Sequence, residues 1–245
     1  MTKIITDEIE VNGIIYPVRI HYEYRRNTRA YIGKNRVNIR IPSFFNREER
    51  LEQLTQMKDW ARKKLQTNQD KFKPKPHKEY KDGDILSFNW EEYRLEIHIN
   101  ERKTGSARIT GNSINLGISS GLNRKTRNKT AAMLISRCIG AKYLLKLREK
   151  IDELNKRHFN RTINEIRFKN NSSNWGSCSK KGNINISTRL LLAPEDVLDY
   201  VCVHELAHLV EYSHSKRFWA LVERATPDYK EKRKWLKTNG HKCVF

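Results

Sequence analysis

Residues 194 to 210 form a stretch whose helix would be apolar on nearly every side. Pro194 suits a first helical turn, where its missing N–H is not needed, and Glu195 and Asp196 suit the positive end of a helix. Apolar residues fill most later positions: Val197, Leu198, Val201, Cys202, Val203, Leu206, Ala207, Leu209 and Val210. A helix of this composition is normally buried. We therefore expect it to be buried.

The polar exceptions in this stretch include His204, Glu205 and His208, which read His-Glu-x-x-His. Two histidines four residues apart lie on one face of a helix, so both imidazoles can reach one metal ion. Glu205 projects from the neighbouring face. Buried imidazoles and a buried carboxylate need partners, and a zinc ion supplies one. The apolar flanks disfavour the alternative, a surface helix with two solvated histidines.

The third ligand is predicted from spacing. A catalytic zinc ion takes three protein ligands and keeps a fourth position for water. His214 has the spacing of the metzincin pattern, although Glu211 replaces the metzincin glycine and no methionine follows the motif. Thermolysin-like ligands, Glu223 or Glu231, are the alternatives. We favour His214 because a neutral imidazole needs no extra charge compensation.

Segments on both sides of the motif have a recognisable order and spacing. They are Asn174-Trp175-Gly176-Ser177-Cys178, Gly182 to Ile186, Leu190 to Pro194, His214-Ser215 with Phe218-Trp219, Pro227-Asp228-Tyr229 and Trp235-Leu236. Together with the His-Glu-x-x-His motif they resemble the YgjP-like metallopeptidases, a family that looks related to the SprT-type zincin peptidases. The likeness is specific over roughly residues 167 to 240 and weaker before them.

This resemblance implies an α+β, zincin-like catalytic core whose active-site helix carries the motif. It implies that His204, His208 and His214 bind zinc (Zn²⁺) and that Glu205 is the general base. The family usually has a basic residue just before the Trp-Gly-Ser-Cys run, where this chain has Asn174.

The sheet edge of such a core can accept an extended peptide by backbone pairing. Trp175, Gly176, Ser177 and Cys178 are the candidates for this substrate-binding edge. The alternative is a packed hairpin whose Trp175 fills the core, and both roles are compatible. For Cys178, packing is favoured over a contact with zinc in a resting state.

The chain before the motif reads as β structure with one helix. Alternating residues predict two hairpins within residues 1–45, with turns at Asn12-Gly13 and around Gly33. A helix follows at about 47–68 and a basic, proline-punctuated linker at about 70–80. Further elements are expected as strands at 85–88, 93–99, 107–109 and 113–118, a long helix at 126–157, strands at 166–168 and 184–187, and a helix at 215–225.

These elements suggest two parts and no internal repeat. We assign residues 1–123 to a β-rich N-terminal region that contains one helix and the basic linker. Residues 124–245 are assigned to the zincin-like metallopeptidase core.

Composition limits the setting of the protein. The 245 residues contain no apolar run near the ~20 residues that a membrane helix needs. The first residues lack the apolar core of a signal peptide, and the four cysteines form no Cys-x-x-Cys pair. We therefore expect a cytoplasmic protein with reduced thiols and no membrane partner.

The expected activity is a hydrolase, a zinc metallopeptidase that cleaves a protein or peptide substrate. A zinc-activated water attacks the carbonyl and Glu205 takes its proton. Tyr212, Tyr229 and a backbone N–H near Trp175 are candidates for stabilising the oxyanion. The alternative role of either tyrosine is packing. The sequence leaves the oligomeric state open.

The basic composition predicts an anionic partner. The net charge is +21, from 49 basic and 28 acidic residues, and nucleic acid is the commonest partner of such chains. Tyr22, Tyr24 and Tyr31 lie among arginines and could stack bases. Because SprT-type relatives act on proteins attached to DNA, the resemblance also implies nucleic-acid-associated substrates.

Two other functions compete with this interpretation. One is a basic nucleic-acid-binding protein whose zinc is structural or vestigial, and the other is an amide hydrolase that acts on a non-peptide bond. A structural zinc site usually has four protein ligands and favours cysteine. Three histidines beside a glutamate favour catalysis.

Overall fold

A tight turn at Asn12 and Gly13 joins the first two strands of the first sheet. Both residues have positive φ, 52° and 76°, as expected for an Asn-Gly pair in a two-residue hairpin. Two antiparallel pairs form, from β1 (Lys3–Val11), β2 (Ile14–Glu23), β3 (Arg29–Ile32) and β4 (Val37–Pro42). Both hairpins predicted from the sequence are confirmed. The computed structural model describes residues 3–33, 36–67, 79–171 and 173–245.

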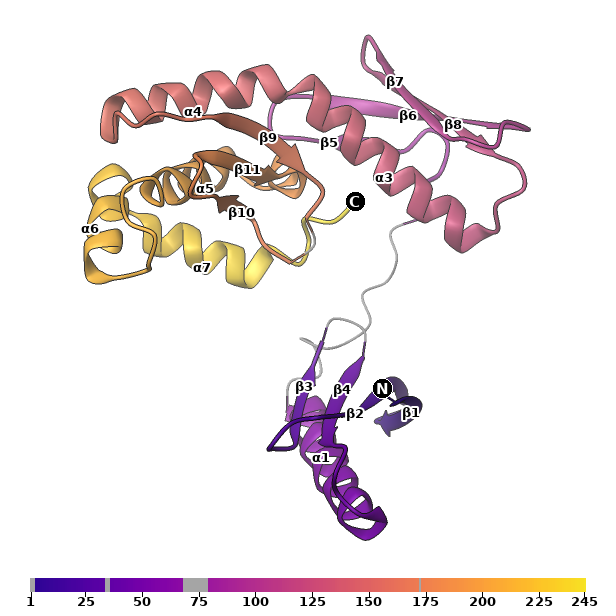
Figure 1. Ribbon diagram of the computed structural model, residues 1–245. Helices are drawn as coiled ribbons and strands as arrows, with labels where there is room; N and C mark the ends of the chain where they lie inside the picture. Colours follow the sequence, from indigo (N-terminus) through magenta and orange to yellow (C-terminus); the bar gives the residue numbers. More distant parts are fainter. Residues whose placement is uncertain (1–2, 34–35, 68–78, 172) are drawn as a thin grey trace. The chain divides into compact units, whose positions relative to one another are not determined.

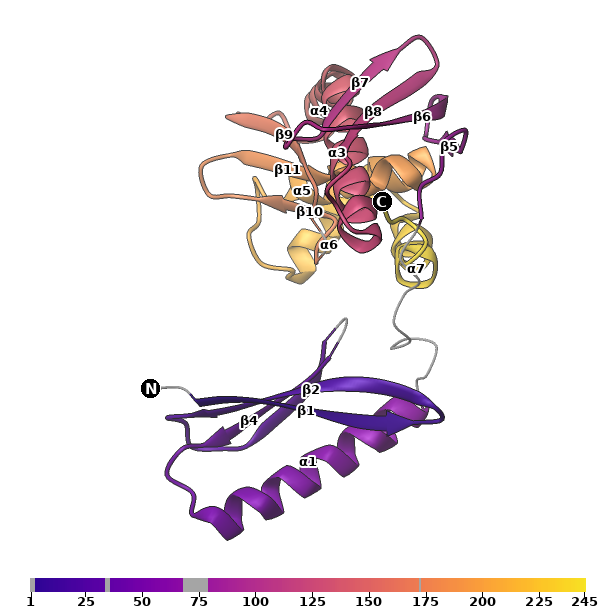
Figure 2. The ribbon, with the colours of Figure 1, turned by 90° about the vertical axis from the view of Figure 1, so that its right-hand side faces the viewer.

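One helix covers one face of this sheet. The strand order is β1-β2-β4-β3, with β2 and β4 parallel, and α1 (Arg47–Thr67) lies along the sheet (Figure 2). The side chains between them are buried: Ile9, Val11, Tyr16, Val18, Ile20, Val37, Ile39, Ile41, Ala61 and Leu65. We expected a basic linker at about 70–80, and its residues up to 78 lie outside the described part of the chain.

The chain divides into two compact units, Met1–Pro76 and His77–Phe245. This division differs from the boundary after residue 123 that we expected from β content. The reason is packing: strands between residues 85 and 119 bury their apolar side chains against the helix that follows them. Leu95, Ile114 and Leu116 share one core with Leu134 and Ile135 of that helix.

The second unit begins with a sheet of the same topology as the first. Its strands are β5 (Ile85–Ser87), β6 (Glu92–Asn100), β7 (Ser106–Thr110) and β8 (Ser113–Ser119). The order is β5-β6-β8-β7, with β6 and β8 parallel and the other pairs antiparallel. A helix follows in both units. The two units therefore repeat one arrangement of four strands and a helix, although the sequence shows no repeat.

The long helix expected at 126–157 is two helices. α3 (Arg124–Lys142) and α4 (Leu144–His158) meet at Tyr143, whose φ and ψ are −98° and 8°. Tyr143 is buried, its hydroxyl lies 2.9 Å from the hydroxyl of Tyr93, and its ring packs on Trp90. These contacts reach residues about 50 positions away in the chain, so local periodicity could not predict the break.

A third sheet and three helices complete the second unit (Figure 1). The sheet order is β10-β11-β9, with β10 antiparallel and β9 parallel to β11. The elements are β9 (Glu165–Lys169), β10 (Gly176–Cys178), β11 (Asn183–Ser187), a short 3₁₀ helix η1 (Thr188–Leu192), α5 (Glu195–Ala207), α6 (Lys216–Ala225) and α7 (Tyr229–Asn239). The helix expected at 215–225 is confirmed, with Ser215 as its N-cap.

The apolar stretch forms α5, as predicted, at the centre of this unit. It contacts β10, β11, η1, α4, α6 and α7, and nine of its side chains are buried. The helix ends at Ala207, so Leu209 and Val210 lie in the turn that follows.

The architecture is therefore of the α+β class, as expected. Over the parts of the chain that the structure describes, we find no helix with both the length and the apolarity that a bilayer-spanning segment requires.

Separate cores predict separate losses of stability. Ile39 is fully buried in the first unit and Ile186 in the second, and truncation of a buried isoleucine to alanine costs about 2–5 kcal/mol. We expect Ile39→Ala to lower amide hydrogen-exchange protection in β2 and β4 while protection in α5 is unchanged. The control Ile186→Ala should show the reverse. Equal loss of protection in α5 for both variants would contradict two independent cores.

Candidate metal centre

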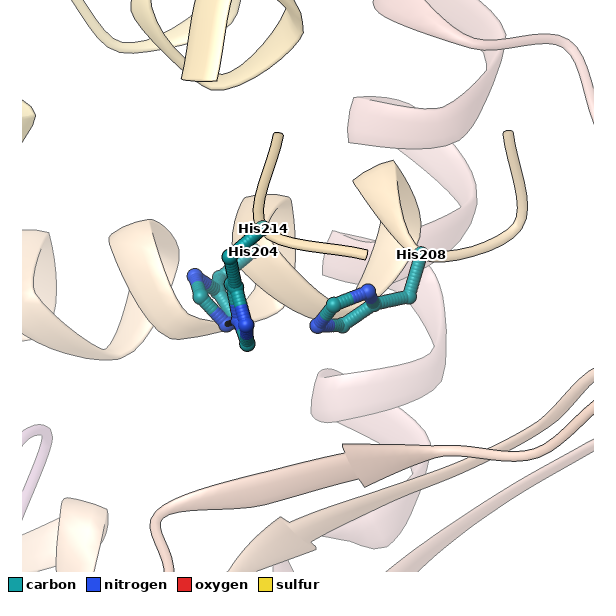
Figure 3. A group of neighbouring side chains, drawn as sticks. All are labelled: His204, His208 and His214. Carbon is teal, nitrogen blue, oxygen red and sulfur yellow. Dashed lines mark hydrogen bonds between the residues drawn. The ribbon is translucent and has the colours of Figure 1, made fainter. Parts of the chain in front are cut away.

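Three histidines converge beside the end of α5. His204 lies in its last turn, His208 is its C-cap, and His214 precedes the N-cap of α6. Their rings point toward one another (Figure 3), and one ring nitrogen from each lies within 4.8 Å of the others. His204 and His208 are half-buried, whereas His214 is exposed to solvent. One side of the cluster is therefore open.

The distances fit a shared cation. The Nε2 atoms of His204 and His214 lie 3.1 Å apart. Two nitrogens on a tetrahedral zinc ion, each about 2.0–2.1 Å from it, are about 3.4 Å apart. Only a small adjustment of the side chains would be needed to admit the ion. Three imidazoles also suit zinc, because nitrogen is a preferred ligand of that ion.

Hydrogen bonding sets the tautomer of His208. Its Nδ1 lies 3.2 Å from the carbonyl oxygen of Glu211. Since a carbonyl only accepts, Nδ1 carries the proton and donates it, which leaves the Nε2 lone pair free for a metal. Nδ1 of His204 is buried without a hydrogen-bond partner among the described residues.

Burial favours the neutral form of His204 and His208. Desolvation lowers the pKa of His204 to about 3 and also lowers the pKa of His208. The neutral imidazole is the form that binds a metal. The two half-buried rings are therefore in a form that can bind a metal at neutral pH.

Aromatic rings hold the cluster in place. Phe218 contacts all three imidazoles, with ring centroids 4.5 to 4.9 Å away. Trp219 stacks on His214 at 5.8 Å, and Ser215 Oγ accepts a hydrogen bond from the Phe218 N–H. The N-cap of α6 thus fixes both the third histidine and the rings that support it. Trp219 and Phe218 belong to the segments that carry the family resemblance, but the sequence analysis predicted no contact between them and the histidines.

Glu205 is buried against β10. It is 4% exposed, and burial raises the pKa of its carboxyl group to about 8. Among the ion pairs of the described residues, none involves Glu205. The backbone of Gly176 covers the carboxylate so closely that a β-carbon there would lie 2.4 Å from Glu205 Oε1. This contact was not predictable from spacing.

The Trp-Gly-Ser-Cys segment combines packing with proximity to the site. Trp175 is half-buried, and the Arg189 guanidinium lies 4.1 Å from its ring centroid. A β-carbon on Gly240 would approach the same ring to 2.5 Å. Trp175 thus packs as the alternative interpretation expected, while the next residue, Gly176, covers Glu205.

The rest of this segment is held by side-chain hydrogen bonds. Asn174 Nδ2 donates to the Gly176 carbonyl oxygen at 2.9 Å, and Asn185 Nδ2 donates to Ser177 Oγ at 3.2 Å. Asn174 therefore has a local structural role where the family usually has a basic residue. Burial and the charge of Glu205 raise the pKa of Cys178 to about 11. Its thiol stays protonated, and it lies outside the histidine cluster, which favours packing over zinc binding.

The two tyrosines expected near the site differ in environment. Tyr212 is 53% exposed, and its hydroxyl donates weakly, at 3.5 Å, to the Lys180 carbonyl oxygen in the turn before β11. Tyr229 is buried, and its ring stacks on Trp219 at 5.3 Å. Tyr212 is the more accessible of the two.

The alternative third ligands lie outside the cluster. Glu223 is exposed and lies 3.5 Å from Lys230, and Glu231 is exposed on α7. In the described chain, the possible metal ligands that converge are the three histidines.

Two neighbours of the cluster were missed from the sequence. Tyr200, one turn before His204, is buried with its ring edge-on to that imidazole at 6.0 Å. Arg233 places its guanidinium 4.9 Å from the ring centroid of Trp219. The position of Tyr200 at i−4 from His204 was a usable signal, but Arg233 comes from another helix.

The chain is similar to known metallopeptidases. The model of the YgjP-like metallopeptidase domain matches residues 26–239. No curated protein sequence matches the chain. Among solved structures, the metallopeptidase zymogen abylysin of Pyrococcus abyssi has 25% identity and a TM-score of 0.34, over 38% of this chain and 94% of its own. Jannalysin of Methanocaldococcus jannaschii, also a metallopeptidase zymogen, has 19% identity and a TM-score of 0.33, over 37% and 93%.

The family match covers most of the chain and includes the helix, the three histidines and the β10 segment. A metallopeptidase needs a metal, and the convergent imidazoles fit one. This chain therefore belongs to the YgjP-like metallopeptidase family, and it is a hydrolase of the peptidase class.

Proposed function

We propose that this metallopeptidase is a zinc enzyme, with His204, His208 and His214 as the metal ligands and Glu205 as the general base. The observation that supports this proposal most strongly is the convergence of three imidazole nitrogens within 4.8 Å of one another, next to a buried carboxylate. Three protein ligands are typical of catalytic zinc, whereas structural sites usually have four and favour cysteine. This difference argues against a structural or vestigial zinc.

The metal, when bound, supplies Lewis acidity that lowers the pKa of a water molecule to about 7 and polarises a carbonyl group. Glu205 supplies the proton transfer. Its carboxylate accepts a proton from water as the new C–O bond forms. It then gives that proton to the amine nitrogen as the C–N bond breaks.

The environment of Glu205 suits a group that takes and returns a proton. Burial raises its pKa to about 8, and a nearby cation would lower that value toward neutrality. A general base works best when its pKa lies near the working pH. The close cover of Gly176 keeps the carboxylate in one position.

The substrate is proposed to pair with β10. This strand is at one end of its sheet, so its outer edge has no partner strand in the described structure. An extended peptide can add to such an edge by backbone hydrogen bonds. Trp175, Gly176, Ser177 and Cys178 would form that edge, which would bring the scissile bond close to Glu205.

Tyr212 is the preferred side-chain donor for the oxyanion. Tyr212 lies shortly after His208 in the chain and its ring is exposed. Its hydroxyl reaches the Lys180 carbonyl oxygen in the turn before β11. Tyr229 is less suitable because it is buried against Trp219. A backbone N–H near Trp175 is the other candidate.

Proteins associated with nucleic acid are the proposed substrates. The net charge of +21 supports this proposal, since it attracts polyanions and the proteins bound to them.

Metal removal tests the function. We expect 1,10-phenanthroline to abolish cleavage of a fluorogenic peptide library, because the ligand set then lacks its Lewis acid. Stoichiometric Zn²⁺ should restore cleavage, and elemental analysis should find one zinc per chain. Undiminished cleavage by a protein shown to be free of metal would refute the proposal.

Replacing the general base tests the role of Glu205. Glu205→Gln keeps the size of the side chain but cannot accept the proton, so we expect turnover to fall by about 10²–10⁴-fold with zinc content unchanged. Glu195→Gln, on the same helix but in an ion pair with Lys150, is the matched control and should stay active. Wild-type turnover in Glu205→Gln would exclude Glu205 as the base.

A methyl group at Gly176 should displace the carboxylate. The added carbon would lie 2.4 Å from Glu205 Oε1, so one of them must move. We expect Gly176→Ala to lower kcat by about 10²-fold, the effect of a misplacement of about 1 Å, with metal binding retained. The control is Gly121→Ala, where the nearest atom lies at 3.9 Å. If both variants have the same kcat, the contact does not position Glu205.

A further inference from the structure

The sheet of the first unit has one face that no helix or strand among the described residues of that unit covers. α1 packs on the other face (Figure 2), against buried side chains of β1, β2 and β4 and partly buried side chains of β3. Because side chains alternate along a strand, the intervening residues point to the uncovered face. The described residues of this unit contain one helix, and it is on the opposite side.

Strand register gathers cationic residues on this uncovered face. Pairing of β2 with β4 and of β4 with β3 aligns their residues across the sheet. Two neighbouring rows result, and they consist of Arg19, Asn38 and Tyr31, and of His21, Arg40 and Arg29. We call these six residues the basic array.

The basic array contains an electrostatic conflict. Arg29 and Arg40 stand directly opposite each other in an antiparallel pair. Like charges in such positions destabilise a sheet. Glu23 offsets part of this repulsion, since it lies 3.3 Å from Arg40, but it is shared with Arg25 at 3.1 Å.

The remaining charge is not neutralised by this unit. Neither Arg19 nor Arg29 has an ion pair in the described part of the chain. The acidic residues Glu8 and Glu10 share the uncovered face, but they are in register with Pro17 and Ile15, toward the hairpin turn. An anion bound over the array would relieve the repulsion.

We propose that the basic array is a binding site for single-stranded nucleic acid. Arginine donates paired hydrogen bonds that match a phosphate group. Tyr31 is 40% exposed within the same array, and an exposed ring beside cations can stack a base. A four-stranded sheet with surface aromatics is also one of the ways in which proteins hold unpaired bases.

Other polyanions fit less well. A duplex is read by a helix or a ribbon that enters a groove, whereas this face is a sheet that presents arginines and an exposed tyrosine. An acidic peptide would satisfy the charge but would make no use of the exposed ring of Tyr31, whose hydroxyl interacts with Arg40. This inference rests on the proposal that the substrates are associated with nucleic acid, and it names the site that would bind that nucleic acid. It does not depend on the peptidase chemistry.

Binding by the full-length chain tests the proposal. Fluorescence anisotropy with labelled oligothymidylate and oligouridylate should show binding that weakens steeply with salt. The variant Arg19→Ala/Arg29→Ala should bind about tenfold more weakly, and its log–log salt slope should fall by about 1.4, or about 0.7 for each lost phosphate contact. The matched control is Arg47→Ala/Lys63→Ala, which removes the same charge from exposed positions of α1 and should have a much smaller effect.

Tyr31 separates stacking from charge. Tyr31→Ala should weaken binding at least about fivefold without a change in salt slope, and Tyr31→Phe should retain binding. Thermal unfolding would verify that all variants fold, and removal of Arg29 should not destabilise the sheet because it relieves repulsion.

Three results would overturn the proposal. These are no binding of either oligonucleotide at low salt, equal losses in the array and control variants, or equally tight binding of polyglutamate that Tyr31→Ala leaves unchanged. The last result would identify an acidic peptide as the partner. Binding measured in Glu205→Gln, and cleavage of a short peptide measured in the array variant, keep this test separate from failure of the peptidase function.

Discussion

The burial of Glu205 is the constraint on which the rest of the site depends. Glu205 is 4% exposed in an apolar helix, so desolvation strongly disfavours its charged form. The raised pKa of its carboxyl group follows from this desolvation. No lysine or arginine of the described chain pairs with it to offset the loss. A metal cation on the adjacent imidazoles would provide the missing charge, which explains why the glutamate and the histidines occur together.

The scaffold places these groups by ordinary packing. α5 is buried on most sides, so its last turn has few orientations open to it. The N-cap of α6 fixes Phe218, and Phe218 supports all three imidazoles. β10 supplies a glycine where any side chain would collide with the carboxylate. Each contact limits the movement of Glu205 or the imidazoles, as the proposed proton transfer over a short distance requires.

Local sequence patterns predicted the local structure well. The positions of His204 and His208 follow from helical geometry, and the Asn12-Gly13 turn follows from the φ preferences of its residues. The family resemblance implied the α+β class, and the apolar composition of residues 194–210 predicted that α5 is buried. His214 was expected from spacing, and the structure brings it to the other two histidines.

Features set by distant contacts were not predictable. The break at Tyr143 depends on Tyr93 and Trp90, and α7 has too polar a pattern to signal a helix from apolar periodicity. The β strands of residues 85–119 seemed to belong with the N-terminal strands by composition, yet they pack on α3. The contact of Gly176 with Glu205 and the rows of the basic array arise from strand pairing, which period-two patterns alone do not specify.

X-ray absorption spectroscopy of the zinc-loaded protein tests the central claim most directly, because it reports the atoms around the ion. The account predicts three imidazole nitrogens and one further light atom at about 2.0–2.1 Å, with no sulfur. A sulfur scatterer at about 2.3 Å, or four imidazole or carboxylate ligands from the protein, would contradict an open catalytic site formed by His204, His208 and His214.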